Sequence, residues 1–121
     1  SLVNKTIAVL GVTFKANTDD TRESPSIAVI ERLIGRGAKV QTYDPMANQL
    51  LMNSVSSFKS ALNAAEDADA LVVLTEWDEF AQLDASEILK VMQNKFVVDT
   101  RNILDKKTWE LAGANFPAIK V

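Results

Sequence analysis

Short apolar runs alternate with amphipathic segments along the whole chain. The first run, 6–10, is almost continuously apolar and ends at Gly11, which is typical of a strand buried on both faces of a parallel sheet. We also expect strands at 39–43, 70–75 and 96–99, and an edge strand at 118–121.

Between these strands, apolar residues recur at helical spacing. Ile27, Ile30 and Ile34 line one face of a helix that begins at Pro25, after Ser24 as N-cap, and that Gly37 ends. Further helices are predicted at 46–52, 58–65, 86–92 and 106–111. This alternation predicts one α/β domain over 1–121, a Rossmann-like, doubly wound parallel sheet with helices on both faces.

Composition restricts the chemistry of this domain. The 121 residues contain no cysteine and no histidine, which excludes a catalytic thiol, a Ser–His pair and a zinc-finger site. The net charge is −3, from 13 Lys plus Arg and 16 Asp plus Glu, and no basic run suggests a nucleic-acid partner. No apolar stretch is long enough to span a membrane, so we expect a cytoplasmic protein.

Candidate binding residues follow the predicted strands, at the carboxyl ends where parallel sheets bind ligands. After the first strand stand Phe14, which can stack on a flat ring or pack in the core, and Lys15, which can neutralise a phosphate or remain a solvated charge. Arg101 follows the strand at 96–99. It either shares this end of the sheet with Lys15 or pairs with Asp99 or Asp105.

Other polar residues at this end of the sheet have two interpretations each. Gly11 is the only glycine where a dinucleotide fingerprint needs several, so we expect no NAD site in this chain. Asp44 stands where Rossmann domains bind a ribose hydroxyl, but a proline follows it and it is equally suited to a turn. Trp77 lines a ligand or covers the strand ends. Asp19 and Asp20 are a weak metal candidate, and no metal site or catalytic residue is expected.

Several of these segments, taken in order, resemble the C-terminal domain of the UDP-glucose/GDP-mannose dehydrogenase family. The long loop signature is GVTFKANTDDTRESPS at 11–26, and the shorter matches are YDP at 43–45, ADA at 68–70, TEWDEF at 75–80 and DTRN at 99–102. Several matches in a fixed order are far more specific than any one of them.

The resemblance implies the substrate-binding domain of a longer, NAD-dependent enzyme that oxidises the C6 alcohol of UDP-glucose or a related UDP-sugar to a carboxylate. NAD and the cysteine nucleophile would belong to a preceding part, a central helical region would form a homodimer, and the isolated domain would be inactive. Phe14, Lys15 and Arg101 would contact the substrate. Thr100 stands where many members have glycine, which affects how far Arg101 reaches.

Two alternatives stay open at this point. The chain is a stand-alone nucleotide-binding or interaction domain, or it serves a dehydrogenase for another nucleotide sugar, a UDP-N-acetylhexosamine or GDP-mannose. A receiver-like signalling module is disfavoured. Asp19 and Asp20 lie too far beyond Gly11 for its acidic pair, and arginine rather than lysine follows Asp99.

Overall fold

The computed structural model describes residues 1–12, 25–46 and 54–117. Their order along the chain is β1 (Thr6–Leu10), α1 (Pro25–Gly35), β2 (Lys39–Tyr43), β3 (Val55–Ser57), α2 (Ala61–Ala65), β4 (Ala70–Val73), α3 (Asp78–Ala81), α4 (Ala85–Val91), β5 (Phe96–Asp99) and α5 (Lys106–Leu111). Within these ranges, no helix has the length and apolar character needed to cross a membrane.

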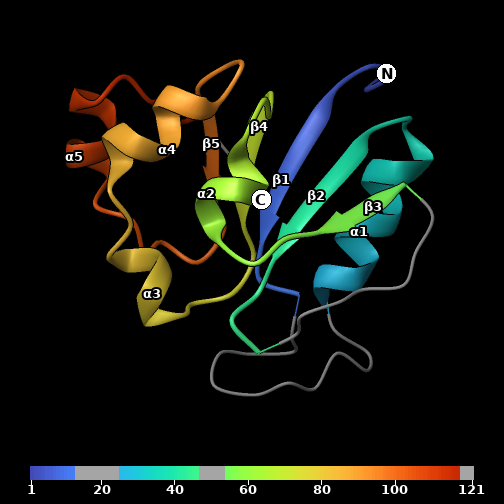
Figure 1. The fold of residues 1–121 in the computed structure, drawn as a ribbon, viewed down its shortest axis with the longest axis horizontal. Helices are drawn as coiled ribbons and strands as arrows, with labels where there is room; N and C mark the ends of the chain where they lie inside the picture. The colour runs from blue at the N-terminus through green and yellow to red at the C-terminus, as the bar shows by residue number, and fades with distance from the viewer. Residues whose placement is uncertain (13–24, 47–53, 118–121) are drawn as a thin grey trace.

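The five strands form one parallel sheet in the order β3-β2-β1-β4-β5 (Figure 1). β1 is central, and its Val9 pairs with Thr42 of β2 on one side and Val72 of β4 on the other. This is the strand order of the doubly wound Rossmann fold, so the predicted fold class is confirmed. The arrowheads in Figure 1 point toward the same end, which we call the carboxyl end of the sheet.

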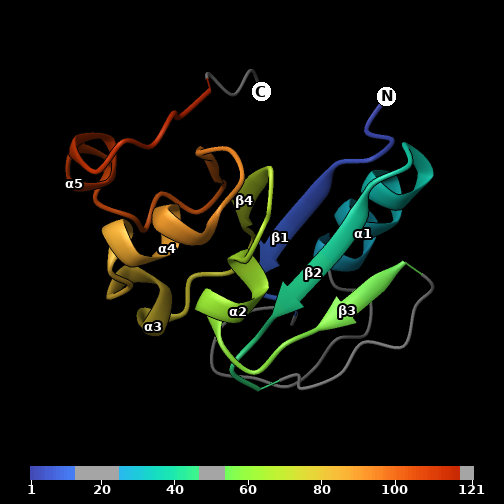
Figure 2. The ribbon, with the colours of Figure 1, turned by 45° about the horizontal axis from the view of Figure 1, so that its top comes forward.

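Helices cover both faces of the sheet (Figure 2). On one face, Ile30 of α1 packs in a core with Ile7 and Val9. On the opposite face, α2, α3, α4 and α5 share a core with Ala8 and Leu10. Successive residues of a strand point to opposite faces, so β1 is buried on both, as its apolar run predicts.

The helix ends follow local side-chain chemistry. Ser60, Asp84 and Asp105 cap α2, α4 and α5, and each side chain accepts a backbone N–H from the first turn of its helix. α1 begins at Pro25, as predicted. Beyond α1, Gly37 has a φ of +98° and turns the chain toward β2, which confirms the predicted stop.

Several elements differ from the sequence predictions. The helix predicted at 58–65 is wrong at its start, because β3 extends to Ser57 and α2 begins only after the cap at Ser60. Neither β3 nor α3 was predicted, because three and four residues are too few to show a strand or a helical period. Residues 47–52 of the predicted 46–52 helix, and the predicted edge strand at 118–121, lie outside the described residues.

The segment after α5 pairs with the outer side of β5. The backbone N–H of Val97 donates to the carbonyl of Asn115 at 2.9 Å, and the N–H of Asn115 donates to the carbonyl of Lys95 at 2.8 Å. Pro117 has no N–H, so it cannot donate the next hydrogen bond of a parallel ladder. The pairing therefore stays short.

Candidate functional site

The carboxyl end of the sheet contains a switch point between β1 and β4. The chain passes from β1 to β2 and β3 on one side, and β4 and β5 lie on the other. In doubly wound sheets, ligands bind in the crevice outside such a switch point. The residues that directly follow the strands therefore define the candidate site.

Gly11 and Thr75 bring the ends of β1 and β4 into contact. Gly11 has a φ of +97°, and a Cβ built on it would lie 2.9 Å from the Cβ of Thr75 and 3.0 Å from its backbone nitrogen. Thr75 is buried, and its Oγ1 has no hydrogen-bond partner in the described part of the chain. Any other residue at position 11 would therefore displace the residues after β4, so this position requires glycine.

Asp44 is a buried carboxylate that connects the end of β2 to the end of β1. It is 1% exposed; its Oδ2 accepts the backbone N–H of Val12 and its Oδ1 that of Met46, both at 2.8 Å. The bond to Met46, two residues further on, is typical of a turn-forming aspartate. Of the two interpretations from sequence, the structure supports the turn.

The described residues match neither a dinucleotide site nor a metal site. A Rossmann dinucleotide site needs close backbone approach after β1 and an acid after β2 that is available to a ribose, and Asp44 instead binds backbone N–H groups. No group of three or more acidic side chains is placed to hold a metal ion in these ranges. Asp19 and Asp20 lie outside them.

Asp99, the last residue of β5, shapes the loop that follows. Its Oδ1 accepts the backbone N–H of Arg101 at 3.1 Å, and its Oδ2 accepts those of Ile103 and Leu104 at 2.9 and 2.8 Å. Asn102 adopts a φ of +56°, in the left-handed region that asparagine tolerates. One carboxylate thus holds three N–H groups of the loop.

Thr100 connects the same loop to the neighbouring strand. Its hydroxyl donates to the carbonyl of Val73 at 2.6 Å, and its backbone N–H donates to the same oxygen at 3.1 Å. Thr100 therefore anchors the backbone beside Arg101 to β4.

Arg101 lies at the carboxyl end of the sheet, and its guanidinium pairs with Glu76. Nε donates to Oε2 of Glu76 at 2.6 Å, and Nη2 forms an ion pair with the same oxygen. The two side chains are 47% and 39% exposed. The acid that binds this guanidinium is thus Glu76, whereas Asp99 accepts the Arg101 backbone N–H and Asp105 caps α5.

Aromatic residues pack around the ends of β2 and β4. Trp77 is buried in the core, so it covers the strand ends. The hydroxyl of Tyr43 donates to Oε2 of Glu79 at 2.5 Å, and its ring meets Phe80 edge-on with centroids 6.2 Å apart. Burial, the hydrogen bond and charge of Glu79, and the charge of Asp44 all raise the pKa of Tyr43 above its ordinary value.

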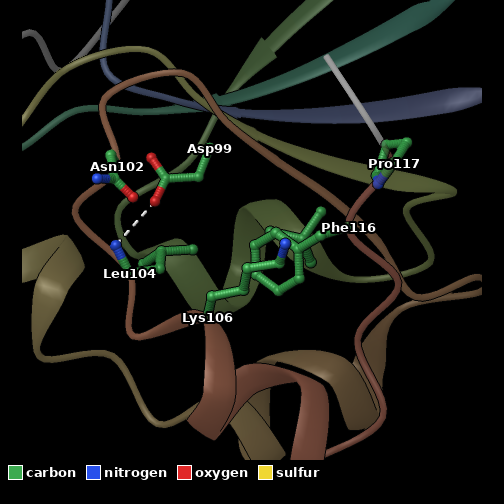
Figure 3. Close-up of a pocket in the computed structure, with 7 residues that line it drawn as sticks. Asp99, Asn102, Leu104, Lys106, Phe116 and Pro117 are labelled. Atoms are coloured by element: carbon green, nitrogen blue, oxygen red, sulfur yellow. Dashed lines mark hydrogen bonds between the residues drawn. The ribbon is translucent and has the colours of Figure 1, made fainter.

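A cavity of about 320 Å³ lies beside the Arg101 loop (Figure 3). Its lining includes Asp99 at the end of β5, Asn102 from the loop, Lys106 from α5, and Phe116. The ammonium of Lys106 lies 5.9 Å from the ring centroid of Phe116. Because this cation already contacts an aromatic face, it is a weaker candidate for an anion contact than the half-exposed guanidinium.

The structure describes one of the three predicted substrate contacts. Arg101 lies where the sequence predicts it, at the carboxyl end of the sheet. Phe14 and Lys15 belong to 13–24, outside the described residues, so the convergence of Lys15 with Arg101 stays a prediction. Glu76 was not predicted as a site residue. The sequence signal is an acid directly after the strand predicted at 70–75, but its pairing with Arg101 depends on β4 lying beside β5.

Comparison with known proteins relates this arrangement to a family. Residues 8–106 match the family model described as "UDP-glucose/GDP-mannose dehydrogenase family, UDP binding domain". The chain is 44% identical over 116 residues to a UDP-glucose 6-dehydrogenase of Rhizobium meliloti, covering 93% of this chain and 26% of that protein. It is 39% identical over 112 residues to a UDP-N-acetyl-D-mannosamine dehydrogenase of Methanocaldococcus jannaschii, covering 88% and 25%.

A solved structure gives the same relationship. The UDP-D-ManNAc dehydrogenase from Pyrococcus horikoshii superposes with a TM-score of 0.77 at 34% identity, over 93% of this chain and 24% of that one. The chain thus spans about a quarter of the length of the relatives that it matches. The matched region extends from β1 into α5 and includes the Arg101 loop. The chain belongs to the UDP-glucose/GDP-mannose dehydrogenase family, within its UDP binding domain.

Proposed function

We propose that this chain is the UDP-sugar-binding part of an NAD-dependent dehydrogenase that oxidises UDP-glucose to UDP-glucuronate. The observation that carries the proposal is Arg101, a half-exposed guanidinium at the carboxyl end of the sheet in a domain of this family. A guanidinium presents its N–H donors in a planar fork that suits phosphate oxygens. The diphosphate of a UDP-sugar is such an anion.

The remaining contacts and chemistry follow from the same proposal. Lys15 adds a second cation for the diphosphate, and Phe14 adds an aromatic face to the substrate. NAD and the catalytic cysteine belong to parts of the enzyme outside this chain, and the full enzyme is a cytoplasmic homodimer. In this division, the chain recognises the substrate and another part oxidises it.

A titration of the chain with UDP, followed by NMR, tests the role of Arg101. A well-formed charged hydrogen bond contributes about 1.5–3 kcal/mol, so Arg101→Ala is expected to weaken UDP binding by about tenfold or more. The shifts are expected around 11–22 and 100–102. The matched control is Arg36→Ala, which removes the same charge from an exposed residue between α1 and β2, at the opposite end of the sheet. Equal losses in both variants would contradict the proposal.

In the full enzyme, the same contacts predict an effect on one substrate. Lys15→Ala and Arg101→Ala are expected to raise KM for the UDP-sugar far more than KM for NAD. Steady-state kinetics with each substrate varied in turn measure the two constants. An equal rise in both constants argues against the assignment of these residues to the UDP-sugar.

The sugar itself has a second candidate. The relatives include a UDP-glucose 6-dehydrogenase at 44% identity and UDP-N-acetyl-D-mannosamine dehydrogenases at 39% and 41% identity. We therefore expect a higher kcat/KM for UDP-glucose than for UDP-N-acetyl-D-mannosamine in the full enzyme. The reverse ratio would reassign the sugar and leave the UDP-binding role unchanged.

A further inference from the structure

The backbone on both sides of Glu76 is fixed by the core. Thr75 and Trp77 are 3% and 8% exposed, whereas the side chain of Glu76 is 39% exposed. On the other side of the ion pair, Asp99 and Thr100 hold the backbone of the Arg101 loop through hydrogen bonds. The carboxylate and the guanidinium therefore meet from two anchored positions, unlike two flexible side chains on an open surface.

Glu76 contacts one side of the guanidinium and leaves the other open. Its Oε2 binds Nε and Nη2 of Arg101. Within the described ranges, Nη1 makes no hydrogen bond or ion pair. The N–H groups of Nη1 and the remaining N–H of Nη2 form the fork that binds phosphate oxygens in a bidentate contact.

We propose that Glu76 is a positioning residue that presents this fork of Arg101 to the diphosphate of the UDP-sugar. The inference rests on the proposed function, because it assumes that Arg101 binds the nucleotide. A guanidinium already held in one direction loses less freedom when the ligand binds. The immobilisation of one long side chain corresponds to about threefold to tenfold in affinity.

The negative charge of Glu76 acts against UDP binding, whereas its positioning of Arg101 favours UDP binding. The direction in which the UDP affinity changes when Glu76 is removed therefore distinguishes the two effects. A carboxylate beside the site repels a diphosphate, so its removal strengthens UDP binding if only charge matters. If positioning dominates, its removal weakens UDP binding although a negative charge has been lost. If Glu76 only competes with UDP for Arg101, its removal also strengthens UDP binding.

The experiment is an NMR titration of the ¹⁵N-labelled chain with UDP. Glu76→Ala is expected to weaken binding about threefold to tenfold, and Glu76→Gln, whose amide oxygen is a weaker acceptor, less than Glu76→Ala. The matched control Glu110→Ala removes an equal charge from an exposed position in α5 and is expected to change affinity by less than about twofold. In the Arg101→Ala background only the repulsion by the Glu76 carboxylate remains, so Glu76→Ala is expected to leave UDP binding unchanged or to strengthen it, and not to weaken it.

Equal or tighter UDP binding by Glu76→Ala would overturn the inference. A second readout needs no ligand: the Nε–H signal of Arg101 is expected to exchange slowly with water in the unsubstituted chain and rapidly in Glu76→Ala, with the amide signals of Thr75 and Trp77 unchanged. Slow exchange in both chains would also overturn it. If the unsubstituted chain does not bind UDP, the proposed function fails instead, while the Nε–H signal still decides whether Glu76 orients Arg101.

Discussion

Asp44 is the buried carboxylate on which the ends of β1 and β2 depend. Its two oxygens accept the N–H groups of Val12 and Met46. An asparagine side chain at this position would offer one oxygen and direct its own N–H donors at the second backbone N–H. We therefore expect Asp44→Asn to lower the free energy of unfolding by about 1–3 kcal/mol. Urea denaturation measures the change.

The control for this prediction is Asp84→Asn. Asp84 is an exposed N-cap of α4, and asparagine caps helices as well as aspartate does, so the change is expected to stay below about 0.5 kcal/mol. If both variants lose the same stability, the buried carboxylate has no special role in this end of the sheet.

Tyr43 gives a pH dependence with a defined sign. It is the only tyrosine of the chain. Its pKa is raised in the folded state, so the neutral phenol is the favoured form there. This contribution to stability is complete below the unfolded pKa of about 10 and declines as the pH rises above it. Ultraviolet absorbance of tyrosinate is expected to appear at a higher pH in the folded chain than in the chain in urea.

The matched variant for this titration is Tyr43→Phe, which keeps the ring against Phe80 and removes the hydroxyl that binds Glu79. We expect it to abolish the part of the alkaline decline in stability that Tyr43 causes. Coincident midpoints for the folded and unfolded chains would refute the raised pKa.

The location of a single residue in the fold was predictable where it depends only on how close the residue is, in the sequence, to the end of a strand. Arg101 lies two residues beyond the end of β5, so the end of the sheet at which it lies could be predicted. Its partner Glu76 is 25 residues away in the sequence, and the pairing depends on β4 lying beside β5. Strand order is not encoded in local pattern, so the ion pair could not be predicted.

At the scale of elements, the close approach of β1 to the residues after β4 predicts contrasting effects for two glycines. Gly11→Ala places a Cβ against Thr75 at a φ of +97°, so we expect it to lower the free energy of unfolding by about 1–3 kcal/mol or more. Gly35→Ala lies at the end of α1 with nothing within 4 Å of the new Cβ. It is expected to change stability little or to raise it by up to about 1 kcal/mol.

Urea denaturation of both glycine variants measures this contrast. An equal effect of the two substitutions would show that the strand ends do not approach each other as closely as the structure has them.

The sequence predicted the elements whose pattern extends over enough residues. β1 and β4 are apolar runs that form interior strands of the parallel sheet, and α1 has a complete apolar face. By contrast, β3 contains two serines in three residues and α3 contains four residues. Neither is long enough to show a period, and both are fixed by the elements that they contact.

At the scale of the molecule, ligand binding is expected to stabilise the whole chain. Two cores on opposite faces of one sheet unfold together in a domain of this size. UDP at about 100 times its Kd therefore raises the free energy of unfolding by about 2.7 kcal/mol. Thermal unfolding at increasing UDP concentration measures this gain. Uridine, which lacks the phosphates, is expected to stabilise the chain much less.

The fold and the family were predictable from the chain as a whole, because alternating elements and several motifs in a fixed order agree. The sugar was not. The chain spans about a quarter of its relatives, and those relatives differ in the sugar that their names give. A pattern shared by relatives with different sugars identifies the nucleotide-binding domain and does not distinguish one sugar from another.

Pro117 has a consequence for the behaviour of the chain at high concentration. An exposed strand edge is a template on which a second molecule can add a strand and start aggregation. Here β3 at one edge has three residues, and β5 at the other is paired through Asn115 in a segment that Pro117 interrupts. These described edges offer little backbone for intermolecular pairing, which favours a chain that stays monodisperse at the concentrations that weak ligands require.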